Sequence, residues 1–183
     1  MVRRAMTHDD ASLAARAQAG DREAFRLLLE RHYDTAYRIA FRFTRCVEDA
    51  EDIAQEVCLS LARRLASFRG RSRFTTWFYT VVLNACRDHA RKQKSTLALQ
   101  ANYAVYREQE MADAADNDSR AQWLDAALLS LEPKLRETAV LVLGEALSHR
   151  EAAEILGCSE STVSWRMHEL RKKLKQLLKE EHD

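Results

Sequence analysis

The sequence predicts an all-α protein, made of two small helical domains joined by a linker, and three observations support this. The 183 residues include one Pro and four Gly, the residues that most often interrupt helices. Apolar residues recur at helical spacing, except over residues 93–118, which are polar and weakly patterned. The net charge of +1 conceals acidic blocks at 48–56 and 107–118 and basic blocks at 63–94 and 166–179. We therefore expect domains at 10–95 and 119–180, with a linker at 96–118.

Four helices are expected in the first domain. Asp9 or Asp10 is suited to cap a short helix that ends at Gly20, and Asp21 to cap a long one. Apolar or aromatic side chains follow the long helix at helical spacing: Phe25, Leu28, Leu29, His32, Tyr33, Ala36, Ile39, Ala40 and Phe43. After a break at 44–47, the pattern predicts a third helix over about 49–66. A basic loop around Gly70 then precedes a fourth helix over about 74–92.

The second domain has clear start and stop signals for helices. Ser119 and Gln122 form a capping-box pattern before an apolar run. Pro133 is suited to the first position of a helix that runs to about Leu143, with Gly144 as its stop. A second capping box spans 148–151, and Gly157 ends the helix that follows it. Ser159 is then expected to cap a last helix that continues to about Leu178.

Residues 148–171 have the spacing of a helix-turn-helix, with a tight turn at 157–159. Counting about 100° per residue from Val163 places one row of the second helix away from the core. Four members of this row are candidates for base or groove contacts: Ser161, Ser164, Trp165 and His168. Basic side chains suited to phosphate are Arg166, Arg171 and Lys172. Two alternatives stay open: a helical hairpin with a solvated basic end, and Trp165 as a partly buried core residue.

The helix from residue 74 has an apolar stripe and an opposite polar face. That face holds Arg73, Thr80, Asn84, Arg87 and Arg91, with Trp77 at its rim. Arg can bind phosphate, Asn can pair with a base edge, and an aromatic ring can stack on an unpaired base. The face therefore suits nucleic acid, although an ordinary solvated helix face would have the same pattern.

The preceding helix has acids and an amide near its start: Asp49, Asp52, Gln55 and Glu56. Acids at this end of a helix are favoured by the helix dipole. They could also form a docking face for a basic partner helix, and the pattern alone does not decide.

Several classes of protein are disfavoured. The four Cys are widely spaced and form no CxxC, and the first ten residues lack the apolar core of a signal peptide. We expect reduced thiols, a cytoplasmic location and no membrane insertion, because no apolar run reaches membrane length. The pairs Cys86–His89 and His149–Cys158 lack a third ligand at suitable spacing, so no metal is expected. No nucleophile–base pair or phosphate loop is present, so we expect neither catalysis nor a cofactor.

The segments together resemble the extracytoplasmic-function (ECF) sigma factors of bacterial RNA polymerase. The run from Asp49 to Glu56 resembles the family's docking segment for the clamp helices of the β′ subunit. The run from Phe68 to Arg91 is similar to its minus-ten recognition segment. Residues 131–137 and 148–171 resemble its minus-thirty-five-binding domain. The order and spacing of these segments carry the resemblance, which covers about 15–95 and 119–178.

This resemblance implies a DNA-binding subunit of RNA polymerase that directs promoter-specific initiation. It implies β′ docking through Asp49, Asp52, Gln55 and Glu56, and a further contact with the β flap. The melted minus-ten strand would be bound by the loop of Arg69, Gly70, Arg71, Ser72 and Arg73 and by Trp77, Thr80, Asn84, Arg87 and Arg91. Duplex minus-thirty-five DNA would be bound through Ser161, Thr162, Ser164, Trp165, Arg166, His168, Arg171 and Lys172. An anti-sigma protein would be a further partner.

One departure concerns the DNA-reading helix. The family commonly has a small or basic pair where this chain has Ser164-Trp165, so the resemblance does not define the minus-thirty-five sequence preference. The alternative function is an ordinary helix-turn-helix regulator that is not a polymerase subunit. That alternative leaves the acidic segment and the basic helix with Trp77 and Asn84 unexplained.

Overall fold

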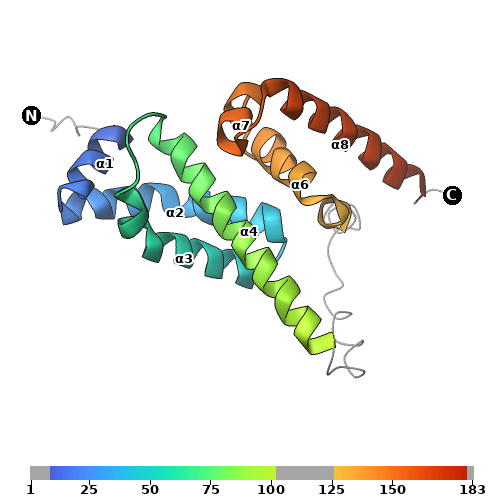
Figure 1. The fold of residues 1–183 in the computed structure, drawn as a ribbon, viewed down its shortest axis with the longest axis horizontal. Coiled ribbons are helices and arrows are strands. Elements are labelled where there is room, and N and C mark those ends of the chain that lie inside the picture. The colour runs from blue at the N-terminus through green and yellow to red at the C-terminus, as the bar shows by residue number, and fades with distance from the viewer. Residues whose placement is uncertain (1–8, 102–125, 181–183) are drawn as a thin grey trace, which may run out of the picture.

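A computed structural model describes residues 9–101 and 126–180, and helices form all of the regular structure within these ranges (Figure 1). The N-terminal bundle consists of α1 (Asp10–Gln18), α2 (Arg22–Thr44), α3 (Val47–Leu65) and α4 (Phe74–Ala101). The described part of the C-terminal bundle starts with helical residues 126–130. It continues with α6 (Pro133–Ala139), the π-helical turn η1 (Val140–Gly144), α7 (His149–Leu156) and α8 (Glu160–Glu180). The all-α prediction is confirmed.

The predicted cap of α2 is confirmed, whereas Asp9 precedes α1 without a side-chain capping hydrogen bond and Asp10 lies inside that helix. The Asp21 carboxylate accepts hydrogen bonds from the backbone N–H groups of Glu23 and Ala24, at 3.0 and 3.1 Å, as its capping role requires. Helix α3 begins at Val47, two residues before the expected start. Helix α4 continues to Ala101, past its predicted end and into the range expected for the linker. Residues 93–101 contain neither Pro nor Gly, so nothing in that stretch stops a helix.

Helices α2, α3 and α4 enclose the core of the N-terminal bundle. The predicted apolar stripes supply its fully buried members, including Leu28, Ile39, Ile53, Leu61, Phe74, Phe78 and Val82. His32 is also buried, with its ring centroid 5.0 Å from that of Phe74 and 5.1 Å from that of Phe78. Its Nε2 atom lies 3.0 Å from Asp10 Oδ2 on α1. Burial disfavours the charged imidazolium and lowers the pKa of His32, although Asp10 opposes the shift.

Most of the predicted helix ends in the C-terminal bundle are confirmed, with one change after α6. Pro133 occupies the start of α6, Ser148 and Glu151 form the capping box of α7, and Gly157 ends α7 in the left-handed conformation at φ 64°. The segment before Gly144 instead widens into the π-helical turn, where the N–H of Glu145 donates to the carbonyl of Val140, five residues earlier, at 3.0 Å. The expected capping box of Ser119 and Gln122 lies outside the described residues.

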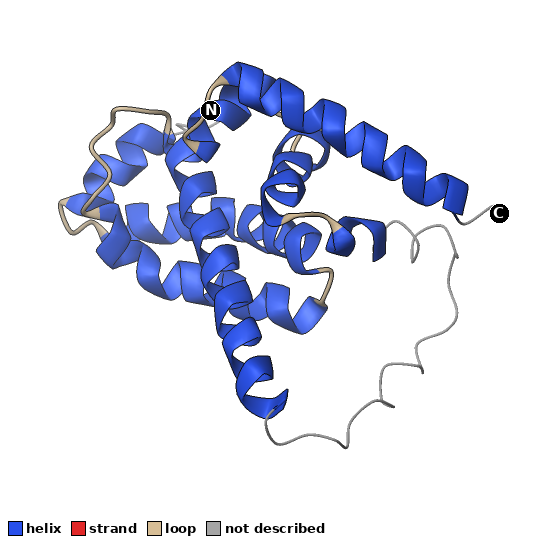
Figure 2. Ribbon diagram, turned by 45° about the vertical axis from the view of Figure 1, so that its right-hand side comes forward, coloured by secondary structure: helices blue, strands red, loops and turns tan. Residues whose placement is uncertain are grey.

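The two bundles pack against each other, which the sequence did not predict. Helix α7 contacts α4, and η1 contacts α2. Figure 1 shows the long α4 helix alongside α6 and α7, the end of α2 reaching past α4 toward the C-terminal bundle, and α8 on the far side of that bundle; Figure 2 shows the same arrangement from a second direction. The polar face of α4 is consequently turned toward the C-terminal bundle, and the outer face of α8 is turned away from it.

Candidate DNA-binding and protein-docking surfaces

Helices α7 and α8 form the predicted helix-turn-helix. Val163, Met167 and Leu170 of α8 are buried, and α8 packs on α6 and α7. The opposite row is exposed along its length and consists of Ser161, Ser164, Trp165, His168, Arg171 and Lys172, whereas Thr162 and Arg166 are half-buried. Trp165 is 61% exposed, so its interpretation as a core residue is wrong. The exposed row has the composition needed to reach base edges and phosphates.

Hydrogen bonds orient the hydroxyl groups at the start of α8. Ser159 Oγ accepts the N–H of Thr162 at 3.2 Å and lies 2.8 Å from the hydroxyl oxygens of both Ser161 and Thr162. On α7, His149 Nδ1 lies 2.8 Å from Ser164 Oγ. His149 is therefore a functional candidate that the sequence analysis missed, because its position inside a capping box gave no sign of a contact 15 residues away.

Three of the four predicted polymerase-docking residues lie together on the outer side of α3. Asp52, Gln55 and Glu56 are exposed and border a hollow of about 530 Å³. Leu59 borders the same hollow and is 85% exposed, so it adds apolar surface beside these polar side chains. The sequence analysis missed Leu59, although its position away from the stripe of Ile53, Val57 and Leu61 was a usable signal.

Asp49, the fourth predicted docking residue, is turned toward α4. Its Oδ2 atom accepts a hydrogen bond from the amide of Gln93 at 2.9 Å, and its Oδ1 atom lies 3.1 Å from His89 Nε2. Asp49 therefore fastens the start of α3 to α4, and the Glu56 carboxylate lies 3.7 Å from Lys92 Nζ of α4, whereas Asp52 and Gln55 face outward.

The predicted minus-ten loop is open to solvent. Arg69, Gly70, Arg71, Ser72 and Arg73 are all exposed, and Gly70 has a φ of 67° that other residues adopt only at a cost. Trp77 is half-buried, with its ring 5.3 Å from that of Phe68 and 5.5 Å from that of Phe74. The aromatic ring at the rim of the α4 face is thus held in place by the core beneath it.

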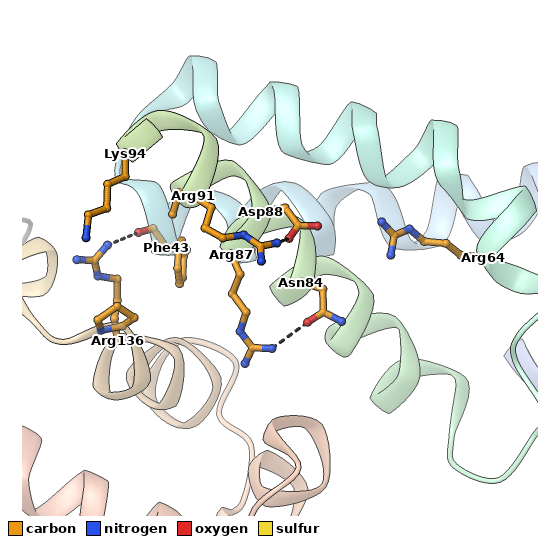
Figure 3. A pocket seen from close by; sticks show the side chains of 10 residues that line it. Phe43, Arg64, Asn84, Arg87, Asp88, Arg91, Lys94 and Arg136 are labelled. Atoms are coloured by element: carbon orange, nitrogen blue, oxygen red, sulfur yellow. Dashed lines mark hydrogen bonds and ion pairs between the residues drawn. The ribbon is translucent and has the colours of Figure 1, made fainter. Parts of the chain in front are cut away.

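The polar face of α4 borders a second hollow, of about 620 Å³, between the two bundles (Figure 3). Asn84, Arg87 and Arg91 line it, and Asn84 Oδ1 accepts a hydrogen bond from Arg87 at 2.8 Å. Figure 3 also places around this hollow three basic side chains that the sequence analysis did not select: Arg64, Lys94 and Arg136. Three of the predicted residues of α4 therefore gather at one mainly cationic surface, which Asp88 also borders.

Carboxylates of the C-terminal bundle reach this same surface. Glu137 of α6 accepts both arms of the Arg87 guanidinium, at 2.6 and 2.7 Å. Glu151 of α7 pairs with Arg73 at 2.6 Å. The hydrogen bonds from Arg73 and from the capping Ser148 lower the pKa of Glu151 to about 2. The sequence analysis did not foresee these contacts.

The described residues contain no group of three or more His, Cys, Asp or Glu side chains placed to hold a metal ion. Among these same residues, no helix has the length and apolar character needed to cross a bilayer.

A helix-turn-helix, a cationic helix face and an acidic helix face occur together in this chain, a combination suited to a DNA-binding protein of the transcription machinery. The family models agree with this class: "Sigma-70 region 2" matches residues 28–96, and "Sigma-70, region 4" matches residues 121–174. The "ECF RNA polymerase sigma factor SigM" of Mycobacterium tuberculosis is 35% identical over 171 residues, which are 92% of this chain and 84% of the relative.

Solved structures give the same result. The structure of CnrH in complex with the cytosolic domain of CnrY has a TM-score of 0.68 and 27% identity, and the match covers 93% of this chain and 97% of CnrH. The sigma factor RpoE of Bartonella quintana, solved with the anti-sigma factor NepR, has a TM-score of 0.64 and 25% identity, with 85% and 96% coverage. The chain belongs to the ECF sigma factors of RNA polymerase, which are transcription initiation factors and not enzymes. Because both bundles match this family, the alternative of an ordinary helix-turn-helix regulator loses its support.

Proposed function

We propose that residues 10–95 bind core RNA polymerase and the minus-ten element, and that residues 119–180 bind the minus-thirty-five element of the same promoter. The observation that carries the proposal is the exposed row of α8, which holds hydroxyl, aromatic, imidazole and basic groups on the outer face of a helix-turn-helix. A second helix in the other bundle, α4, offers Asn84, Arg87 and Arg91 around one hollow. Two DNA-contacting surfaces on separate bundles suit two separated promoter elements.

We assign polymerase docking to Asp52, Gln55, Glu56 and Leu59 of α3. The exposed leucine supplies apolar area, and the surrounding acids favour a basic partner such as the β′ clamp helices. Asp49 contributes by holding α3 against α4 rather than by direct contact.

We assign minus-ten binding to the loop of residues 69–73 and to the face of α4. Gly70 and its exposed neighbours offer backbone and basic groups to an unpaired base, with Trp77 as a supported aromatic surface beside them. Asn84 is positioned by Arg87, and its amide is suited to a base edge. Arg91 adds a cation at the end of this face.

Minus-thirty-five binding is assigned to the exposed row of α8, with His149 as a positioning residue for Ser164. The β flap of the polymerase is the further partner that this domain would contact. We also propose that the chain acts in the cytoplasm and is held inactive by an anti-sigma protein, as the relative RpoE was solved with NepR.

The decisive experiment is reconstitution of the chain with core RNA polymerase, followed by sequencing of the transcript starts that it directs. The variant Asp52→Ala/Gln55→Ala should weaken core-polymerase binding at least about tenfold, because hot-spot residues at such interfaces contribute about 2 kcal/mol or more. Asp34→Ala/Gln176→Ala is the matched control, since it also removes one aspartate and one glutamine side chain, but from exposed sites outside α3. Undiminished binding by the α3 variant would remove the docking assignment, and unchanged transcript starts would remove the proposed function.

A further inference from the structure

Gln18, the last residue of α1, is joined to a segment of the chain about 50 residues away. Its side-chain amide donates hydrogen bonds to the carbonyl of Leu65 at 2.8 Å and to the carbonyl of Phe68 at 2.7 Å. Leu65 is the last residue of α3, and Phe68 directly precedes the minus-ten loop of residues 69–73. In Figure 1, α1 accordingly lies beside the loop between α3 and α4. Both N–H groups of the amide are used at the point where the chain leaves α3 and enters the loop.

The rest of α1 provides a fixed support for this amide. Leu13 and Ala14 are fully buried, and α1 packs on α2, α3 and α4. Arg16 donates two hydrogen bonds to the Asp21 carboxylate, at 2.9 and 2.7 Å, and so fastens α1 to the start of α2. The Gln18 side chain itself lies at the surface. It therefore contributes little to the core, but it projects from a helix that is held firmly in place.

The ring and the carbonyl of Phe68 are held by different parts of the bundle. The ring is buried, with its centroid 5.6 Å from that of Phe74 and 5.3 Å from that of Trp77. The carbonyl is held by Gln18 of α1. A trans peptide group is planar, so its N–H points opposite to its carbonyl. Holding the Phe68 carbonyl toward α1 therefore also sets the direction of the Arg69 N–H, the first donor of the loop.

The loop beyond Phe68 is exposed along its whole length, from Arg69 to Arg73. At its far end the chain enters α4, where the N–H of Trp77 donates to the carbonyl of Arg73 at 3.2 Å. Contacts with an extracted base must offset the stacking that the base has lost, and they do so only when the binding groups are held within about 0.5 Å of the right geometry. The loop takes this geometry from its two ends, and Gln18 holds one of them.

We propose that Gln18 is a positioning residue for the minus-ten loop, and that it determines how strongly the loop distinguishes the base it receives, without contacting DNA itself. This inference rests on the proposed function, because it takes the loop of residues 69–73 as the site of an unpaired base. It gives α1, a helix with no assigned contact to DNA or polymerase, a role in promoter selection.

Two substitutions remove the hydrogen bonds in different ways. Gln18→Ala deletes the amide, whereas Gln18→Glu keeps the length of the side chain and replaces its NH₂ group by an oxygen that accepts but does not donate. Gln176→Ala is the matched control, since it removes an exposed glutamine from α8, far from the loop. Urea unfolding followed by circular dichroism should give near-wild-type stability for all three variants, because both glutamines lie at the surface.

Hydrogen–deuterium exchange measures the order of the loop entrance without DNA. The amides of Ser67 and Phe68 donate to the carbonyls of Arg64 and Leu65 at 2.9 and 3.0 Å. In both Gln18 variants these two amides should exchange about fivefold faster than in the wild type, the change expected for the loss of hydrogen bonds of ordinary strength. Amides in the middle of α2 and in the Gln176→Ala control should keep their rates. Unchanged exchange at 67 and 68 in both variants would overturn the positioning role.

Base selection is measured with holoenzyme reconstituted from the full-length chain and core RNA polymerase. The probes are fluorescent single-stranded oligonucleotides with the non-template minus-ten sequence of a promoter whose start has been mapped, each with one abasic nucleotide at a different position. In the wild type, the abasic position that costs most affinity identifies the base held by the loop. In both Gln18 variants that one loss should shrink about fivefold, while the losses at other positions stay as they are. The Gln176→Ala control should keep the wild-type profile.

A general defect in folding would instead weaken the binding of every oligonucleotide by the same factor. Equal weakening at all positions, or a wild-type profile in both variants, would overturn the role of Gln18 in base selection. If the wild-type holoenzyme itself showed the same loss at every abasic position, the loop would hold no particular base, and the minus-ten assignment of the loop would fail together with this role. The exchange rates at 67 and 68 separate that failure from a failure of the contact between Gln18 and the loop.

Discussion

Trp165 and Met167 are two residues apart on α8 but face opposite environments, so they form a matched pair of probes. Trp165 is 61% exposed, whereas Met167 is 1% exposed against α6 and α7. Replacing each by Ala should distinguish the proposed DNA-contacting face of the helix from its packing face.

The structure sets the expected size of each effect. A Trp side chain can bury about 200 Å² when fully enclosed, so the covered part of Trp165 corresponds to roughly 80 Å². At about 25 cal/mol per Å² this burial contributes about 2 kcal/mol. Residual burial in the unfolded chain reduces that value by about 10–40%. Because Ala has a better helix propensity than Trp, the substitution also regains about 0.5 kcal/mol. We therefore expect Trp165→Ala to cost about 1 kcal/mol, and Met167→Ala about 3 kcal/mol because it leaves a cavity.

Urea unfolding followed by circular dichroism measures both stabilities without relying on the Trp fluorescence that one variant loses. Transcript sequencing with reconstituted polymerase then measures promoter choice. Trp165→Ala should keep the fold and change the minus-thirty-five sequences used. Met167→Ala should mainly lower the free energy of unfolding. Equal destabilisation by the two substitutions would refute the assignment of Trp165 to the DNA-contacting face.

Three further predictions follow from individual side chains. Asn84→Ala should lower initiation at a cognate promoter more than it lowers core-polymerase binding; equal losses would indicate a role in folding instead. As the pH falls from about 7.5 to about 5.5, the free energy of unfolding of the His32→Gln variant should decrease less than that of the wild type. Burial lowers the pKa of His32 from 6.5, so below that value the unfolded chain takes up a proton more readily than the folded chain, and stability falls; parallel stability curves would contradict this. Burial raises the pKa of the Cys86 thiol to about 12, so iodoacetamide should modify Cys86 only after unfolding, and modification of the folded chain would show that it is accessible.

The sequence alone predicted the features that depend on local chemistry. The capping roles of Asp21, Ser148 and Ser159 and the left-handed end at Gly157 depend on groups within a few residues of each other, so periodicity and capping rules locate them. The helix-turn-helix follows from the same rules, because its core and its outer row are set by helical spacing from Val163. The all-α class was predictable for this reason.

Some details of the candidate site were only partly predictable. Asp49, Asp52, Gln55 and Glu56 were selected as one face, but helical spacing does not reveal that His89 and Gln93 turn Asp49 toward α4. Leu59 was missed because the analysis followed the apolar stripe and did not ask which apolar residue lay outside it.

The tertiary structure decided how the two bundles meet. Glu137 and Glu145 look like ordinary charged residues in the sequence, and Arg38, Arg42 and Arg87 look like parts of solvated helix faces. Their pairing joins segments 50 to 107 residues apart, and no repeat or local signal encodes such a distance. Packing of the C-terminal bundle on α2 and α4 buries the Glu137 and Glu145 carboxylates, and only this burial turns the arginine-bearing helix faces into specific contacts. Whether the surface of α4 is open or covered is therefore a property of the folded chain.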